Sequence, residues 1–114
     1  MKDFPDFMKN KKNAIAEGSQ SSGIEGYVYD GADGSQMIHW TCGADGVSKE
    51  HAHNYDEYMV VVSGRYDMLI GGKKTGLAAG DEYYIPKGVP HAGAFIAGTR
   101  TIHCFGGKRA ERKG

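Results

Sequence analysis

The most informative segment of the chain, residues 51–64, reads HAHNYDEYMVVVSG. Side chains alternate between the two faces of an extended strand, so His51, His53 and Glu57 have the same parity and are expected on one face. Two imidazoles and one carboxylate form a mixed nitrogen and oxygen donor set, which suits Mn, Fe, Co, Ni, Cu or Zn. The segment therefore predicts a transition-metal site on a β-strand.

A second segment, residues 80–91, reads GDEYYIPKGVPH and ends on another histidine. Gly88 gives the backbone freedom to turn after Pro86, and His91 then stands at the start of the next predicted strand. Antiparallel pairing of the two segments is expected to bring His91 across to the first three donors.

Together the two segments resemble the signature motifs of the cupin superfamily. The first motif, G(x)5HxH(x)3–4E(x)6G, is matched from His51 to Gly64, and the second, G(x)5PxG(x)2H(x)3N, is matched from Gly80 to His91. The resemblance implies a jelly-roll barrel that binds one divalent metal. The metal ligands that it implies are His51, His53, Glu57 and His91.

The chain departs from these motifs at two positions. Asp45 stands where the first motif has its opening glycine, and the glycine follows at Gly46, which should alter a loop more than the ligands. Phe95 replaces the asparagine that ends the second motif. If this position faces inward, the pocket loses an amide and gains an apolar wall, so the substrate of one family member does not transfer directly.

The rest of the chain supports an all-β fold. It has 18 glycines and only 3 prolines, and short β-branched or aromatic segments alternate with turn signals, as in sandwiches and barrels. We expect strands at residues 24–30 and 36–42 and a hairpin within residues 65–77. The predicted organisation is an N-terminal arm (1–23), one all-β domain, an antiparallel jelly-roll β-barrel (24–107), and a charged, frayed tail (108–114).

Composition and hydropathy limit the partners. The 14 basic and 14 acidic residues cancel, which argues against a nucleic-acid-binding surface. No apolar run approaches the ~18 residues of a membrane-spanning helix, and the N-terminus lacks a signal peptide, so we expect no membrane partner and a cytoplasmic location.

The apolar run at residues 58–62 predicts one face in the barrel and one in a homodimer interface. Cys42 and Cys104 are expected to be buried, inert thiols, with a redox pair or an extra metal ligand as the alternatives.

Several polar side chains outside the ligand set are candidates for function. Tyr55 and His103 are candidate proton-transfer groups, because a tyrosine near the metal or a near-neutral imidazole can carry a proton. The alternatives are that Tyr55 caps the barrel rim and that His103, like His39, is only a hydrogen-bonded strand residue. Arg100 should have the opposite parity to His103. We expect Arg100 to be exposed at the barrel edge, the alternative being an inward guanidinium that binds a substrate carboxylate.

These features predict a small metalloenzyme acting on an oxygen-rich small molecule, either sugar-derived or a carboxylate or enol. The cupin resemblance allows isomerase, decarboxylase or dioxygenase chemistry, and the fold alone does not select among them. The alternative is a non-catalytic barrel that binds or senses a sugar-type ligand, and a storage-type barrel ranks third.

Overall fold

The computed structural model describes residues 1–16 and 23–113, so residues 17–22 of the predicted arm lie outside it. Two 3-10 turns, η1 (Asp6–Met8) and η2 (Lys11–Asn13), come first. Nine strands follow in the described part of the chain: β1 Ile24–Asp30, β2 Gln36–Cys42, β3 Gly46–Val47, β4 Glu57–Ser63, β5 Arg65–Ile70, β6 Lys73–Ala78, β7 Glu82–Ile85, β8 Ala92–Phe95 and β9 Arg100–Phe105. No helix within these residues is long and apolar enough to cross a membrane.

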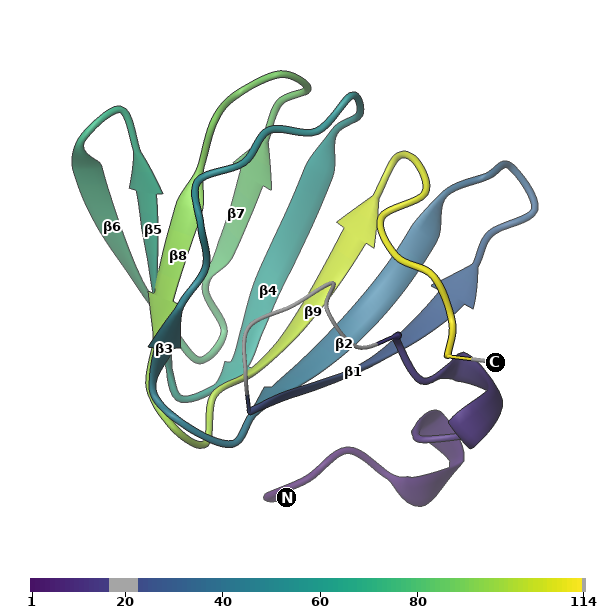
Figure 1. Cartoon of the computed structure of the whole chain (residues 1–114). Helices are drawn as coiled ribbons and strands as arrows, with labels where there is room; N and C mark the ends of the chain where they lie inside the picture. Colours follow the sequence, from purple (N-terminus) through teal and green to yellow (C-terminus); the bar gives the residue numbers. More distant parts are fainter. Residues whose placement is uncertain (17–22, 114) are drawn as a thin grey trace.

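The strands form two antiparallel sheets, ordered β1-β2-β9-β4-β7 and β3-β8-β5-β6 (Figure 1). Their pairing is nested around one tight turn: β5 pairs with β6, β4 with β7, β3 with β8, and β2 with β9. Gly71 and Gly72 make that turn with φ values of 57° and 79°, which only glycine adopts without strain. Nested antiparallel pairing is the jelly-roll arrangement, so the predicted fold class is confirmed.

The register of β2 and β9 determines which side chains face the interior. Trp40 lies opposite Thr101, and Ile38 lies opposite His103. Because side chains alternate along a strand, His39 and Arg100 point to the outer face, so Arg100 and His103 lie on opposite faces, as predicted. Two clusters of buried apolar side chains form the core: Ile15, Val28, Ile38, Trp40, Phe105 and Ala110 in one, and Met59, Val61, Met68, Leu77 and Ile85 in the other.

The N-terminal segment covers part of this outer face. The ring of Phe4 lies 4.5 Å from that of His39 and 4.9 Å from the guanidinium carbon of Arg100. Arg100 donates hydrogen bonds to the Met1 carbonyl and to the Ser63 hydroxyl, and it is 5% exposed. The prediction of an exposed Arg100 is therefore wrong, because the start of the chain packs over it.

The C-terminal tail is docked rather than frayed, so the prediction of fraying is also wrong. The side-chain oxygen of Gln36 accepts hydrogen bonds from the backbone N–H groups of Arg109 (2.7 Å) and Ala110 (3.0 Å). Farther along, Arg112 forms an ion pair of 2.7 Å with Asp30. These contacts hold residues 108–113 against the end of the domain.

The two cysteines lie in different environments. Cys42 is buried, as predicted, whereas Cys104 is exposed, and both thiols are free. Cys104 has opposite parity to the inward-facing His103 and lies on the outer face of β9, so the prediction of a buried thiol is wrong there. Cys42 lines an internal cavity, which places the two thiols on opposite faces and argues against a redox pair.

The glycine that ends the first motif should be essential for stability. Gly64 has φ 81°, and a Cβ there would lie 2.6 Å from the Cα of the buried Thr99. Gly98 has a similar φ of 89° with open space around it, so it is a matched control. We expect Gly98→Ala to lower the free energy of unfolding by about 1–2 kcal/mol through backbone strain, and Gly64→Ala to lower it by about 1–3 kcal/mol more through overpacking. Urea unfolding measures both, and equal losses would contradict the packing argument.

The buried His39 should make stability depend on pH. Burial lowers the pKa of His39 below its ordinary 6.5, while its Nε2–H donates to the Met8 carbonyl at 2.8 Å. As pH falls below 6.5, the unfolded chain takes up a proton that folded His39 does not, so the folded state loses stability. Between pH 7 and 5 the protein should therefore lose more unfolding free energy than a His39→Gln variant, which does not titrate at this position. Parallel curves from urea unfolding would contradict this.

Candidate metal centre

The predicted histidines meet where the two motif segments pair. The backbones of His51 and His91 form an antiparallel bridge with two N–H···O hydrogen bonds of 2.9 Å, so the expectation that His91 crosses to the first segment is confirmed. The reasoning from strand parity is wrong in one respect. His51 and His53 precede β4 in an extended loop, and of the first segment's three donors only Glu57 belongs to the strand.

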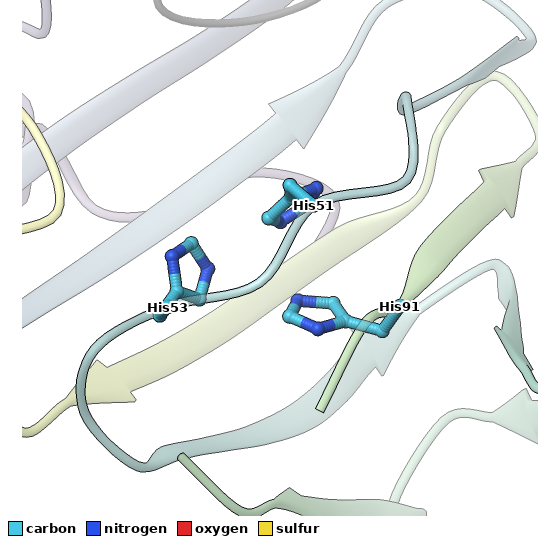
Figure 2. A group of neighbouring side chains, drawn as sticks. All are labelled: His51, His53 and His91. Carbon is cyan, nitrogen blue, oxygen red and sulfur yellow. The ribbon is translucent and has the colours of Figure 1, made fainter. Parts of the chain in front are cut away.

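The three imidazole rings converge in Figure 2. The ring centroids of His51 and His91 are 4.3 Å apart, those of His51 and His53 are 4.8 Å apart, and those of His53 and His91 are 5.2 Å apart. One nitrogen from each ring lies within 4.8 Å of the others. This spacing allows the three side chains to bind a single metal ion.

The carboxylate of Glu57 lies beside the same nitrogens. Its Oε1 is 3.3 Å from His53 Nε2 and 3.4 Å from His91 Nε2. All three atoms are buried, and none has a hydrogen-bond partner in the described part of the chain. Buried polar atoms are normally paired, so three unpaired donor atoms facing one another fit a bound cation.

Hydrogen bonds at the far side of each ring orient the histidines. The Nδ1 atoms of His51 and His91 lie 2.7 Å and 2.9 Å from the carbonyls of Lys49 and Val89. A carbonyl only accepts, so each Nδ1 carries the proton and the neutral ring presents an unprotonated Nε2. This is the usual support of a metal-binding histidine.

The protonation states also fit metal binding. Burial lowers the pKa of His51, and it lowers that of His53 to about 4. Burial opposes the charged form of Glu57 too, but the hydrogen bond from His103 and the adjacent His91 ring outweigh it and hold the carboxyl pKa well below its usual range. For His91, burial is outweighed by the neighbouring carboxylate, which raises the pKa. The cluster thus contains an ionised carboxylate and two imidazoles that are neutral at neutral pH.

The two predicted proton-transfer residues contact the cluster in different ways. His103 Nδ1–H donates to Glu57 Oε2 at 2.8 Å, and its Nε2 lies 3.0 Å from the Thr101 hydroxyl. The Tyr55 hydroxyl lies 3.3 Å from His53 Nδ1 and donates to the Lys108 carbonyl at 3.4 Å. The Tyr55 ring stacks on the His53 ring at an interplanar angle of 8°, so Tyr55 packs against the His53 side chain and limits its rotation.

A cavity opens in front of the cluster. The space within it that the centre of a water molecule can occupy is about 80 Å³, enough for several waters at roughly 10–15 Å³ each. Phe95 forms part of its wall and is buried, which confirms the apolar wall expected from the second motif. The cavity is lined by Ile24, Trp40, Cys42, Ser48, His51, Glu57, Tyr66, His91, Phe95, Thr101, His103, Phe105 and Arg109.

Tyr66 and Arg109 are among the lining residues that reasoning from the sequence did not single out. Tyr66 lies in β5, and its alternation with the buried Met68 is a signal that would have placed it on the inner face. Arg109 belongs to the charged tail, where no local pattern distinguishes it from its solvated neighbours. Only the docking of the tail onto Gln36 brings Arg109 to the cavity.

Comparison with known proteins agrees with the fold. An RmlC-like cupin from Shewanella frigidimarina is 20% identical, with a TM-score of 0.74 over 96% of each chain. KdgF from Halomonas sp. is 21% identical, with a TM-score of 0.70 over 79% of this chain and 86% of that one. Salicylate 1,2-dioxygenase from Pseudoaminobacter salicylatoxidans, solved with gentisate, is 15% identical, with a TM-score of 0.69 over 75% of this chain and 25% of that one. No curated protein matches the sequence.

The family match extends beyond the two motifs. The Cupin domain family matches residues 38–105, from β2 to the end of β9. This region holds the nested strands and all three histidines of the cluster, and it covers more than half of the chain. The chain therefore belongs to the cupin family.

Proposed function

We propose that this cupin is a divalent-metal-dependent enzyme acting on a small, oxygen-rich anion, either sugar-derived or a carboxylate or enol. The observation that carries the proposal is the set of unpaired, buried donor atoms of His53, Glu57 and His91 at a cavity lined by Glu57 and His91. Solved structures with a similar fold include a dioxygenase bound to gentisate, an oxygen-rich anion. Isomerase, decarboxylase and dioxygenase chemistry all remain within the proposal.

The ligands in this proposal are His51, His53, Glu57 and His91. Three nitrogens and one carboxylate oxygen suit Mn, Fe, Ni, Co, Cu or Zn. A divalent ion held there supplies a Lewis acid for a substrate oxygen or, if it is redox-active, a centre for oxidation. The protein contributes the orientation of the rings through Lys49 and Val89.

Within this proposal His103 is the proton-transfer candidate, and Tyr55 positions a ligand. His103 lines the cavity and contacts Glu57, so it lies close to a substrate held there. Tyr55 is absent from the lining residues of this cavity, and its hydroxyl is bonded to His53 and Lys108. Its contacts support a role in fixing the His53 ring.

The charge around the cavity favours an anion. Arg109 lines it, half-buried, with its guanidinium carbon 6.0 Å from the Phe105 ring centroid. No carboxylate in the described part of the chain pairs with Arg109, whereas the adjacent Lys108 pairs with Glu111 at 2.8 Å. A divalent metal with one carboxylate ligand leaves a single positive charge, and Arg109 adds a second. An oxygen-rich anion with one negative charge would neutralise one of these charges, and a dianion would neutralise both.

The outer face of the larger sheet supports a homodimer as part of this proposal. Tyr58 of β4 and Tyr84 of β7 are cross-strand neighbours, and they are 38% and 57% exposed. Met59 and Val61, which alternate with Tyr58, are buried in the core. The apolar run thus has one buried face and one aromatic face open to a second subunit.

Replacing different histidines should lower metal affinity by different amounts. We expect the purified protein to hold one divalent metal per chain, and His53→Ala to remove it because a ligand is lost. His103→Ala should weaken metal affinity by about 10–100-fold, the usual effect of losing a group that orients a ligand. His39→Gln, on the outer face, is the control and should keep full metal content. Elemental analysis after dialysis measures this, and full occupancy in His53→Ala would refute the proposed site.

Turnover should depend on Arg109. A screen of carboxylates and sugar acids, run with and without oxygen, should find a substrate whose conversion stops when the metal is removed by a chelator. Arg109→Gln should lower kcat/KM for that anion by about 10–100-fold, since a charged hydrogen bond is worth about 1.5–3 kcal/mol. Lys108→Gln is the matched control and should leave kcat/KM unchanged. Equal values for the two variants would contradict the role of Arg109, and binding without turnover would favour the sensor alternative.

A further inference from the structure

A tyrosine forms part of the cavity wall that the second sheet contributes. Tyr66 belongs to β5, whereas Glu57 and His103 belong to the five-stranded sheet. Its ring is stacked on that of Phe95, with centroids 6.2 Å apart, and presents an edge contact of 6.4 Å to the His103 ring. Tyr66 therefore lies at the same cavity as the Glu57–His103 pair and is held in place by two other lining residues.

The backbone next to the Tyr66 hydroxyl requires a glycine. Gly93 is buried in β8 directly beside Tyr66, and a Cβ at position 93 would overlap the Tyr66 hydroxyl and ring. The N–H of Gly93 donates to the Ser48 hydroxyl at 2.9 Å, and Ser48 lines the cavity together with Tyr66. Gly93, which has no side chain, thus leaves the space that the Tyr66 hydroxyl occupies.

Tyr66 and Ser48 both line the cavity. The Tyr66 hydroxyl carries one donor proton, which it can offer to an acceptor atom held in the cavity. Burial, and after it the negative charge of Glu57, raises the pKa of Tyr66 to about 12, so the phenol keeps its proton at neutral pH.

We propose that the Tyr66 hydroxyl is a substrate-binding group that donates a hydrogen bond to an acceptor oxygen of the anion held at the metal cluster. This inference rests on the proposed function and narrows its substrate class. The substrate carries an anionic group for Arg109 and, beyond it, a carbonyl, enol or hydroxyl oxygen that accepts from Tyr66. A neutral donor there stabilises negative charge on that oxygen more than it stabilises the uncharged group.

Oxalate is a suitable probe, because it is a small anion with four acceptor oxygens. Isothermal titration of oxalate into the metal-loaded protein should give an affinity that Tyr66→Phe weakens by about 10–100-fold, the value of a hydrogen bond to a charged group. Gly93→Ala, which displaces the hydroxyl, should cause a comparable loss. Tyr84→Phe, at an exposed tyrosine outside this cavity, is the control and should bind as the parent does.

Measuring metal content distinguishes a failure of this inference from a failure of the proposed function. Tyr66→Phe should retain the full metal content of the parent protein, because Tyr66 is not a ligand. Equal oxalate affinity in the parent and in Tyr66→Phe, or no oxalate binding by the parent, would overturn the inference while leaving the metal site intact. If the parent binds no metal, the proposed function fails, and the same pair titrated with oxalate in the metal-free state then decides the role of Tyr66.

Discussion

The buried charge of Glu57 is the constraint that organises the interior of this protein. The residue is 5% exposed, and an ionised carboxylate in such a place is costly unless it is paired and hydrogen-bonded. His103 satisfies one oxygen, while the other faces two imidazole nitrogens and has no hydrogen bond within the described chain. A cation bound among these atoms would offset the cost of burying the charge, so metal binding would stabilise the fold as well as supply chemistry.

The sequence was sufficient to identify the residues of the candidate metal cluster and most strands, because both are set by local patterns. Strands β1 and β2 begin and end where alternation and turn residues predict, and the β5–β6 hairpin forms at its glycine pair. Motif spacing singled out the candidate ligands, although their supposed strand geometry was wrong. His51 converges on His91 through an isolated backbone bridge that lies outside the strands, which parity along one strand does not describe.

What the sequence did not reveal depends on contacts between distant segments. Arg100 is buried because its guanidinium reaches the carbonyl of Met1, and no rule based on neighbouring residues predicts that partner. Arg109 reaches the cavity because its backbone binds Gln36. In both cases a terminal segment takes its position from a polar side chain on the sheet. For the C-terminal tail, composition indicated a solvated end where the structure has a packed one.

The nested pairing of the strands also implies an order of assembly. Closing a loop costs more entropy as the loop lengthens, so the β5–β6 hairpin, with its two-glycine turn, is the least costly pair to form. Once it exists, it brings the ends of β4 and β7 together, and that pair in turn shortens the effective loop between β3 and β8. The bridge from His51 to His91 lies just outside β3 and β8, so the metal cluster takes shape late, after the inner pairs have closed.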